Sequence, residues 1–281
     1  MIRRVLQKQT LASFDYQWRE LTAGGALLTD DWFTQNVDRI ISEELLCLDR
    51  EWFRGKRVLD AGSGNGRWSV GLLRLGCDVV AVDASAHALD RVREAAGEHS
   101  SGSVDRLETR VVDLLELPPD LAAERFDLVF SFGVLHHTGD TRGALRNVGG
   151  LVREGGVISL YLYGQESVSG RSRAALELRR LALAPLPFEL KRRLIARRGV
   201  DVHQAFDQLS PVINSRHTFE QVQGWLERDG FSGIDRTIDH SELFVRAEHG
   251  SANLDEFDLP RPSPPYWFDR YESAMKAQAG A

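Results

Sequence analysis

The sequence predicts an α/β protein whose core is a doubly wound, mostly parallel sheet. First, residues 58–73 read as a short apolar strand, a glycine turn and an amphipathic helix. Second, strand-like segments alternate after this stretch with helical segments of about 10–15 residues, which is typical of parallel βαβ units. Third, acidic residues stand at the ends of the expected strands, at Asp60, Asp83 and Asp113. Ligands of open α/β sheets bind at these carboxyl ends, so we expect the functional site there.

The glycine turn follows the pattern D-x-G-x-G-x-G, with Gly62, Gly64 and Gly66. Three glycines in five residues favour positive φ angles and let a ligand approach the backbone closely. With the helix N-terminus that follows, the turn resembles the start of a Rossmann-like nucleotide site, although it could also be an ordinary tight turn. The dinucleotide fingerprint would need a small residue at position 67, which is Arg67. There is no G-x-x-x-x-G-K-[ST] either, which disfavours a triphosphate loop.

Length and composition indicate an ordinary soluble globular protein. The chain has 281 residues, of which 42% are hydrophobic and 27% charged, enough for one domain with elaborations. The net charge of −6 and the pI near 5.8 argue against a general polyanion binder and leave local basic patches open. Cys47 and Cys77 lie far apart without metal spacing, so we expect no disulfide framework and no metal site. The N-terminus lacks the apolar core of a signal peptide and no apolar run approaches ~18 residues, which predicts a cytoplasmic location.

Residues 1–50 are expected to form an N-terminal helical lid or cap. The aromatic residues Phe14, Tyr16 and Trp18 stand close together there, either as a helix face packed on the core or as a cover over a ligand. An apolar spacing of three and four then predicts a helix before the first strand, with residues 29–31 at its N-cap.

Residues 51–163 are expected to form the ligand-binding core. Its second strand is predicted at 77–83, a third strand ends at Asp113, and a fourth covers 126–132. Near-continuous apolar runs such as these are typical of parallel strands that are buried on both faces. Ser85 is the expected cap of the helix after the second strand, and a fifth strand follows the two glycines at 155 and 156.

Residues 164–220 break this alternation and predict a helical insertion, with two helices separated by Pro185 and Pro187. The insertion is basic and allows three interpretations. It can be a solvated helical face, a lid that binds an anionic small molecule, or a nucleic-acid platform, which would need more exposed aromatic residues than Phe188. The arginines that such a lid would use are Arg171, Arg173, Arg179 and Arg180.

The last helix and a terminal β-hairpin are expected within residues 221–250, and a proline-rich aromatic tail over residues 251–281. The tail carries Tyr266, Trp267 and Phe268 in succession. These rings could close the pocket of the core or mediate a dimer, so both a monomer and a homodimer stay open.

The strand ends form an ordered set of candidate binding groups. Asp60 accompanies the glycine turn, Asp83 can accept both hydroxyls of a ribose, and Asp113 with Leu114 can flank an adenine. The segment from Ser131 to His137 leaves the fourth strand. A single aspartate at a strand end is more often a helix cap or a turn residue, whereas the ordered set is much harder to obtain by chance.

This order resembles the motif series of the class I S-adenosylmethionine (SAM) dependent methyltransferases, over residues 57–163. The match lies in D-A-G-S-G-N-G, F-S-F-G-V-L-H-H-T and L-V-R-E-G-G. The resemblance implies a Rossmann-like seven-stranded sheet of order 3-2-1-4-5-7-6 with strand seven antiparallel, the last hairpin being formed by strands on either side of Asp239 and His240. The segments F-D-Y-Q-W and D-Q-L-S-P…H-T-F-E further resemble a branch of small-molecule and sugar methyltransferases.

The same resemblance implies SAM as the cofactor, with S-adenosylhomocysteine (SAH) as its product, and assigns its contacts. Gly62, Gly64 and Gly66 would line the methionine moiety, Asp83 would bind the ribose, and Asp113 with Leu114 would flank the adenine. The remaining residues that we expect near the cofactor are Asp60, Ala84, Ser131, Trp18 and Tyr16.

Methyl transfer depends more on holding the donor and the acceptor in position than on protein groups that form bonds, and it needs no metal. A general base is required only for a protonated nucleophile of high pKa, and His136 and His137 are the candidates, although the pair could simply end the fourth strand. The substrate-side candidates are Tyr161, Tyr163, His203, His217 and Arg171.

We therefore expect an enzyme that methylates a small molecule, possibly an anionic one, at oxygen by in-line displacement, with nitrogen and carbon acceptors left open. Binding to nucleic acid or to a membrane is not expected. Two alternatives are an RNA- or protein-modifying methyltransferase and a SAM- or SAH-binding regulatory protein without activity. The sequence does not specify the acceptor.

Overall fold

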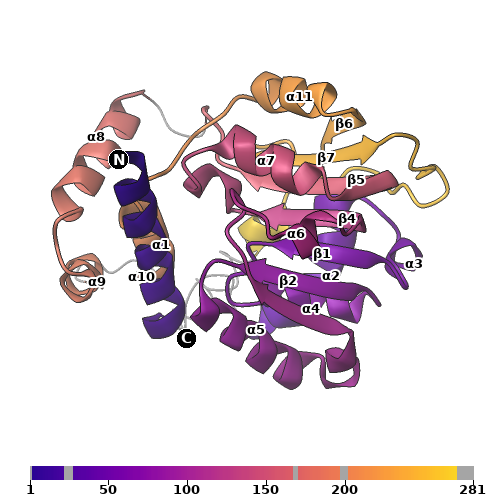
Figure 1. Cartoon of the computed structure of the whole chain (residues 1–281), viewed down its shortest axis with the longest axis horizontal. Coiled ribbons are helices and arrows are strands. Elements are labelled where there is room, and N and C mark those ends of the chain that lie inside the picture. Colours follow the sequence, from indigo (N-terminus) through magenta and orange to yellow (C-terminus); the bar gives the residue numbers. More distant parts are fainter. Residues whose placement is uncertain (1, 22–27, 167–169, 197–201, 271–281) are drawn as a thin grey trace.

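The computed structural model describes residues 2–21, 28–166, 170–196 and 202–270. Its centre is a seven-stranded sheet of order β3-β2-β1-β4-β5-β7-β6 (Figure 1). β7 runs antiparallel to β5 and β6, and the other paired strands are parallel, which confirms the expected fold and the hairpin around residues 239 and 240. The strands are β1 (Arg57–Ala61), β2 (Asp78–Asp83), β3 (Leu107–Val111), β4 (Phe126–Phe132), β5 (Val152–Leu162), β6 (Phe231–Arg236) and β7 (Leu243–His249).

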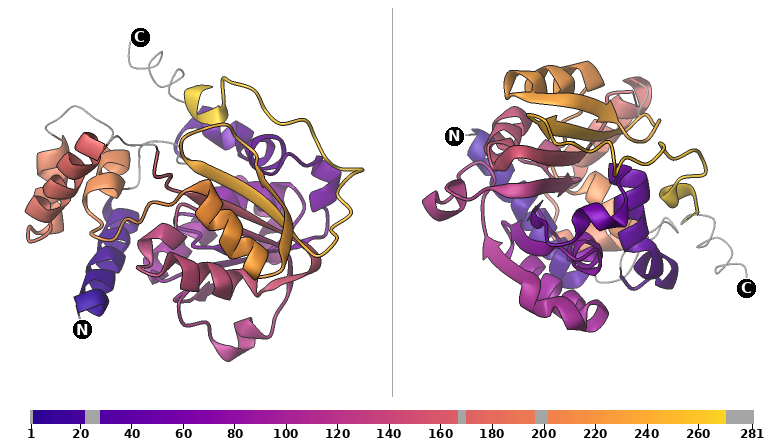
Figure 2. Two further views of the ribbon diagram at one scale, coloured as in Figure 1. Left: turned by 90° about the horizontal axis from the view of Figure 1, so that it is seen from above. Right: turned by 90° about the vertical axis from the view of Figure 1, so that its right-hand side faces the viewer.

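Helices cover both faces of this sheet, as Figures 1 and 2 show. One face packs against α2 (Asp31–Arg39), the π-helical turn η1 (Ile40–Leu46), α3 (Arg50–Phe53), α4 (Arg67–Arg74) and α5 (Ala86–His99). The other packs against α6 (Pro119–Ala122), α7 (Thr141–Gly149) and α11 (Phe219–Arg228). Two short 3₁₀ turns, η2 (Ser101–Arg106) and η3 (Leu135–His137), lie in the connections.

The strands are apolar on both sides because each side faces a separate core. In β1, Val58 belongs to the cluster on the first face, whereas the next residue, Leu59, belongs to the cluster on the second. Val79 and Val80 of β2 divide in the same way. This alternation explains the near-continuous apolar runs of the sequence.

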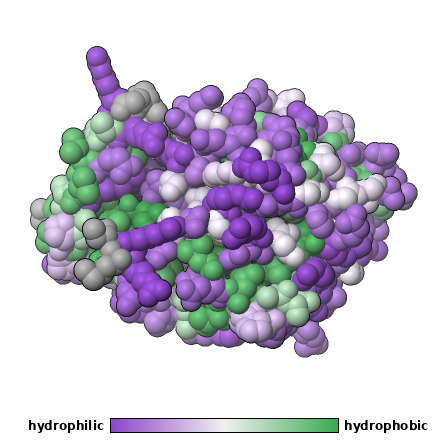
Figure 3. All heavy atoms as spheres, turned by 45° about the horizontal axis from the view of Figure 1, so that its top comes forward, coloured by the Kyte–Doolittle hydropathy of each residue, from purple (hydrophilic) through white to green (hydrophobic). Residues whose placement is uncertain are grey.

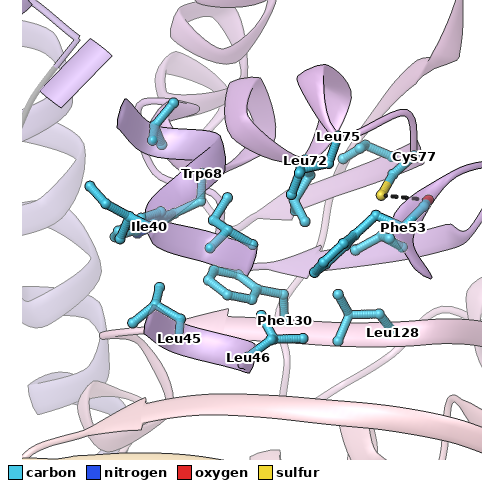
Figure 4. Close-up of a cluster of buried hydrophobic side chains, with 14 of the residues drawn as sticks. Ile40, Leu45, Leu46, Phe53, Trp68, Leu72, Leu75, Cys77, Leu128 and Phe130 are labelled. Carbon is cyan, nitrogen blue, oxygen red and sulfur yellow. Dashed lines mark hydrogen bonds between the residues drawn. The ribbon is translucent and has the colours of Figure 1, made fainter. Parts of the chain in front are cut away.

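Figure 4 shows the first of these clusters, in which Trp68 of α4 and Phe130 of β4 meet the side chains of the N-terminal helices. The rings of Trp68 and Phe130 lie 5.9 Å apart between centroids. Cys77 Sγ donates to the carbonyl oxygen of Phe53 at 3.3 Å, so this thiol is buried and bonded. Truncation of a fully buried ring such as Phe130 to alanine would cost about 3–5 kcal/mol, and this packing therefore fixes α4 against the sheet.

The predicted helix caps are confirmed at two positions. Asp30 accepts the backbone N–H of Phe33 at the start of α2, and Ser85 accepts that of Ala88 at the start of α5. The end of the third strand was placed two residues too late, because β3 ends at Val111. Asp113 instead begins a turn, in which its carboxylate bonds to the backbone two residues ahead.

A group of helices stands beside the sheet, at the left of Figure 1. It contains α1 (Ile2–Glu20), α8 (Gly170–Leu183), α9 (Phe188–Ala196) and α10 (Val202–Leu209), and we call it the cap. The two helices separated by prolines are present as predicted, whereas α10 was not predicted. A small apolar cluster around Tyr16 and Phe206 joins α1 to α9 and α10.

Helix α1 crosses the carboxyl edge of the sheet and is tied down along its length. Arg3 donates to the carbonyl oxygen of Gly139 after β4, at 2.6 Å. Further along the helix, Ser13 bonds to Ser210 of the insertion at 2.6 Å. Asp15 accepts the hydroxyl of Ser85 at the start of α5, also at 2.6 Å. The helix therefore bridges the two halves of the sheet and the insertion.

The basic side chains of the insertion are mostly solvated. Arg171 and Arg179 are exposed on α8, whereas Arg180 is buried and donates to the carbonyl oxygen of Gln208, which fixes α8 against α10. In Figure 3 apolar side chains gather on the left of the molecule, where Figure 1 places α8 and α9. The exposed leucines of these helices are Leu178, Leu181, Leu190 and Leu194.

The C-terminal segment folds back onto the first core. Tyr266 and Trp267 are buried, and the backbone N–H of Trp267 donates to Glu44 at 2.7 Å. Arg270 forms an ion pair with the same carboxylate at 3.0 Å. The aromatic tail is thus part of the fold. Across the described residues, no helix is both long and apolar enough to cross a bilayer.

Candidate active site

A cavity of ≈ 490 Å³ lies at the carboxyl edge of the sheet, where the sequence placed the site. Its floor is formed by the glycine turn and by the ends of β2, β4 and β5. Residues of α1 and α10 cover it, and Trp267 and Phe268 of the tail close one side. This volume is within the range of small-molecule sites in proteins.

The glycine turn has the backbone that only glycine adopts readily. Gly62, Gly64 and Gly66 have φ angles of +86°, +54° and +83°. A Cβ on Gly62 would lie 2.5 Å from Cγ1 of Val134, and one on Gly64 would lie 2.9 Å from the indole of Trp18. The first two glycines line the cavity, whereas Gly66 stands behind it as the N-cap of α4. The turn is therefore a close-fitting cradle.

Asp83 ends β2 and lines the cavity beside Ala84. Its Oδ2 accepts the N–H of Gly64 at 3.0 Å, and its Oδ1 accepts the N–H of Ser85 at 2.9 Å. Burial raises the pKa of this carboxyl, and the backbone donors counteract the shift by stabilising the charged form. The carboxylate is therefore held in one orientation next to the glycine cradle.

Asp113 and Leu114 line the cavity in the turn after β3. Asp113 is exposed and its Oδ1 accepts the N–H of Leu115 at 2.9 Å. Leu114 is buried, and its carbonyl oxygen accepts the side-chain amide of Asn147 at 2.9 Å. The apolar side chain of Leu114 and the carboxylate of Asp113 thus stand on the same side of the cavity as Asp83.

The two aromatic residues expected near the cofactor lie on different sides of α1. Trp18 lines the cavity and packs on the glycine turn. Tyr16 does not line the cavity, and its hydroxyl donates to Glu189 at 2.7 Å while its ring stacks on Phe206. Burial and this bond raise the pKa of Tyr16 to about 12. Tyr16 therefore holds the cap together and lies away from the expected cofactor position.

Asp60 and Ser131 lie beneath the cavity and do not line it. Asp60 is buried and accepts the hydroxyl of Ser69 at 2.6 Å. Burial raises the pKa of this carboxyl to about 7, which the bond from Ser69 only partly offsets. Ser131 donates to the carbonyl oxygen of Ala61 at 2.9 Å. Both residues support the ends of β1 and β4 from below.

The structure separates the two base candidates. His137 lines the cavity, and its Nδ1 bonds to the carbonyl oxygen of Ile213 at 2.8 Å. A carbonyl accepts only, so Nδ1 carries the hydrogen and Nε2 keeps a lone pair. Burial lowers the pKa of His137, which favours this neutral form. Nε2 is buried and has no hydrogen-bond partner among the described residues.

His136 does not line the cavity. It is fully buried and its ring stacks on that of Tyr163 at 4.0 Å between centroids. Burial holds its pKa well below the usual range, and neither ring nitrogen has a hydrogen-bond partner among the described residues. We assign His136 a packing role in supporting the wall of the cavity.

Tyr161 and Tyr163 both line the cavity at the end of β5. Tyr161 stacks on Phe132 at 4.4 Å between ring centroids. Tyr163 donates its hydroxyl to Oδ2 of Asp207 at 2.9 Å. Burial raises the pKa of both tyrosines, which keeps them protonated and able to donate.

The other substrate-side candidates divide into one inside the cavity and two outside. His203 lines the cavity and bonds to Gln17 at 3.0 Å. His217 does not line it, because its ring faces Thr141 and Trp225 on the second face of the sheet. Arg171 is exposed on α8 and is likewise absent from the lining.

Sequence reasoning missed several charged residues of the cavity. Arg67 follows the glycine turn, Asp207 comes from α10, and Arg216 with Glu242 comes from two loops. Arg216 and Glu242 form an ion pair at 3.5 Å. The only local signal was Arg67, the residue that breaks the dinucleotide fingerprint. The others meet only through the tertiary fold.

An antiparallel seventh strand in this sheet order, with a glycine cradle facing acidic strand ends, defines the class I methyltransferase architecture. Residues 59–158 match the family described as a methyltransferase domain. Over these residues the chain therefore resembles a methyltransferase domain, in agreement with the class I SAM-dependent motifs of the sequence.

The relatives are methyltransferases that are named for different substrates. Ubiquinone biosynthesis O-methyltransferase of Actinobacillus pleuropneumoniae is 30% identical over 104 residues, which cover 37% of this chain and 44% of that protein. The tRNA 5-carboxymethoxyuridine methyltransferase of Escherichia coli is 33% identical over 135 residues, or 46% of each chain. The alignments therefore span less than half of these relatives.

A solved structure with the same fold is magnesium protoporphyrin IX methyltransferase from Synechocystis PCC 6803 with bound SAM. It is 16% identical, the match covers 88% of this chain and 97% of that one, and the TM-score is 0.52. This similarity establishes the fold. Together with the domain match and the relatives, it supports the expectation of a SAM-dependent methyltransferase.

Proposed function

We propose that this protein is a SAM-dependent methyltransferase that transfers a methyl group to an oxygen atom of a small molecule. The observation that carries the proposal is the single cavity wall in which the cradle of Gly62 and Gly64 adjoins Asp83 and Asp113. The activity itself is part of the proposal, because the alignments with the relatives span less than half of the relatives' lengths.

The residues on this wall fit the cofactor. Gly62 and Gly64 line the cavity and carry no side chain, so a ligand can approach their backbone closely. Asp83 offers a fixed carboxylate to a ribose, and Leu114 offers an apolar surface to an adenine beside Asp113. When bound in this position, SAM supplies a methyl group activated by a cationic sulfonium.

The protein's own contribution is positioning and exclusion of water. Helix α1 covers the cavity through Phe14 and Trp18, and the tail closes it through Trp267. A well-oriented pair of reactants reaches effective molarities of ~10⁵–10⁸ M, so positioning alone can supply most of the rate acceleration.

A hydroxyl acceptor would lose its proton to Nε2 of His137, which is buried in this structure and would have to face the acceptor in the occupied cavity. This nitrogen keeps its lone pair because Nδ1 donates to Ile213, and the lowered pKa keeps the imidazole neutral at pH 7. A positioned general base contributes about 10²–10⁴-fold. An acceptor that arrives ionised would not need this step.

An RNA substrate is the second candidate, because one relative is named a tRNA methyltransferase. The enclosing cap and tail favour a small molecule instead, and the negative net charge disfavours a phosphate backbone. In turnover assays with labelled SAM, an RNA acceptor would show competition by polyanions and a steep dependence on salt.

The test of the proposed function is a labelled-methyl assay with a panel of phenols, catechols and hydroxy acids, with total tRNA as a parallel substrate. We expect label in at least one small molecule and none in tRNA. Label in tRNA alone would contradict a small-molecule acceptor and would make RNA the acceptor class. SAH binding without any transfer to either pool would support the regulatory alternative.

A further inference from the structure

The cavity is lined by two groups of side chains that the expected cofactor contacts leave unused, and their chemistry points to the acceptor. This inference rests on the proposed function. One group consists of aromatic rings, and the other consists of four charged residues that come from different elements. The rings are Trp68, Phe132, Tyr161, Phe244, Trp267 and Phe268, and the charged residues are Arg67, Asp207, Arg216 and Glu242.

The rings form one continuous aromatic wall, in which Phe132 contacts both Tyr161 and Trp68, with ring centroids 4.4 Å and 4.5 Å away. Trp267 extends the wall beyond Trp68, at 5.8 Å. Phe244 extends it beyond Tyr161, at 4.8 Å. Aromatic rings attract each other through stacking and edge contacts in addition to the burial of their area. The wall therefore favours a flat aromatic acceptor over a saturated one.

The four charged residues form two pairs of opposite sign. The side chain of Arg216 is 8% exposed and forms the ion pair with Glu242 at 3.5 Å. Burial lowers the pKa of Arg67, and the carboxylate of Asp207 is the charge that opposes this shift most strongly. Two cations are thus balanced by two carboxylates in the lining of one cavity. A ligand with a net charge would lose its water here without meeting an excess of the opposite charge, which is costly.

Three further titratable side chains beside these pairs are neutral. Burial raises the pKa of Tyr161 and of Tyr163, so both hydroxyls stay protonated. Burial also lowers the pKa of His137, so its ring is neutral at pH 7.5. The balance of the two pairs is therefore kept. It favours an uncharged ligand, whereas the sequence left an anionic acceptor open.

One end of the aromatic wall offers acceptors for a hydroxyl hydrogen. The ring of Tyr163 lies 5.9 Å from that of Tyr161 and 5.6 Å from that of His137, between centroids. The hydroxyl of Tyr163 donates to Oδ2 of Asp207 at 2.9 Å, so Asp207 and His137 stand at the same end. A carboxylate has lone pairs for about four hydrogen bonds, and Asp207 can therefore accept from a ligand while it holds Tyr163.

We propose that the acceptor is an uncharged phenol, whose ring lies against the aromatic wall and whose hydroxyl group points to the end formed by His137 and Asp207. Asp207 is then a substrate-binding residue. Arg67 and Arg216 neutralise the two carboxylates and bind no charged group of the acceptor. The balanced charges select against both acids and amines of the same shape.

The experiment compares three probes that share one catechol ring and differ in the charge of one substituent. They are 3,4-dihydroxybenzamide, 3,4-dihydroxybenzoate and 3,4-dihydroxybenzylamine, titrated at pH 7.5 into the SAH-saturated full-length protein and followed by calorimetry. The wild-type protein is expected to bind the uncharged amide about 10-fold or more tightly than either the acid or the amine. Benzamide should also bind about 2- to 12-fold more tightly than cyclohexanecarboxamide, because only benzamide has a ring that can stack.

Two variants of opposite sign test the balance of charge. Asp207→Asn leaves one cation in excess, so the affinity for the acid relative to the amide should rise by about 5-fold or more. Arg67→Met leaves one carboxylate in excess, so the amine should gain on the amide by a similar factor. The ratio of two probes on one variant cancels any common loss of affinity.

Asp105→Asn is the matched control for the loss of a carboxylate. Asp105 is exposed in η2, just before the amino end of β3, and is not part of the cavity lining. This variant should keep the wild-type ratios of all three probes.

Three results would overturn the proposal. The wild-type protein could bind the acid or the amine as tightly as the amide, or it could bind SAH but none of the three probes at 10 mM. Alternatively, either charge variant could leave its ratio unchanged. Failure of the folded wild-type protein to bind SAH would instead refute the proposed function.

Discussion

Replacement of Gly62 by alanine tests whether the glycine turn is a close-fitting cradle. Gly62 has a φ of +86°, and an added Cβ would lie 2.5 Å from Cγ1 of Val134. Gly55 is a matched control with a φ of +67° and no atom within 4 Å of an added Cβ. Both substitutions incur the left-handed backbone penalty of about 1–2 kcal/mol. Only Gly62→Ala adds overpacking, which costs about 1–3 kcal/mol.

We therefore expect Gly62→Ala to lower the free energy of unfolding by about 2–5 kcal/mol, and Gly55→Ala by about 1–2 kcal/mol. Urea denaturation followed by circular dichroism gives both values, and calorimetry gives the affinity for SAH. Gly62→Ala should also weaken SAH binding, because Val134 and the cradle line the same cavity. Gly55→Ala should leave SAH binding unchanged.

The reasoning can be refuted by a double-mutant cycle. Combining Gly62→Ala with Val134→Ala removes the close contact, so the pair should be more stable than the sum of the single changes implies by about 1–3 kcal/mol. Additive losses, or equal losses at Gly62 and Gly55, would show that Val134 does not restrict the turn.

Two further predictions concern titratable groups. The folded-state pKa of Asp60, about 7, exceeds its unfolded value near 3.8, so the protein loses stability from this group as pH rises between about 4 and 7. Asp60→Asn removes the dependence, and its stability relative to wild type should increase by about 1.4 kcal/mol per pH unit from pH 5 to 7; a constant difference in urea melts would contradict the raised pKa. His137→Asn should lower kcat for a hydroxyl acceptor by about 10²–10⁴-fold with SAH affinity unchanged, whereas His249→Asn, at the opposite end of β7, should not. Because burial lowers the pKa of His137 below its ordinary value of 6.5, the wild-type rate should change little from pH 7.5 to 8.5, and unaltered turnover in His137→Asn would exclude it as the base.

The sequence was most informative where the information is local. Apolar periodicity placed β4 at residues 126–132, and capping side chains at Asp30 and Ser85 marked two helix starts. Glycine spacing predicted positive φ angles at three positions, and all three have them. Backbone sterics and short-range hydrogen bonds decide these features, so neighbouring residues suffice to predict them.

Side-chain direction was harder to predict. Tyr16 and Trp18 are two residues apart on one helix, and at ~100° per residue their side chains point about 200° apart. Only Trp18 can therefore face the cavity, a consequence that became usable once the region was known to be helical. His136 and His137 diverge in the same way within η3, where only the second reaches the cavity.

The charged residues Asp207, Arg216 and Glu242 of the cavity could not be predicted from local patterns. Asp207, Arg216 and Glu242 come from three segments that have no shared spacing and meet only when the cap and the last hairpin are in place. The basic composition of the insertion suggested arginines that bind a ligand, whereas Arg171 is solvated and Arg180 joins two helices. A charged side chain on a helix indicates a ligand site only when the direction in which that side chain points is known.

The measurement that most directly tests the central claim is calorimetric titration of SAH into the wild-type protein and into Asp83→Ala. The account predicts saturable binding of one molecule per chain to the wild type. On the proposed assignment Asp83 accepts both ribose hydroxyls, so its loss should remove about 3–6 kcal/mol and abolish measurable binding in the variant. Asp83→Ala with unchanged affinity, or a folded wild-type protein that binds no SAH, would contradict it.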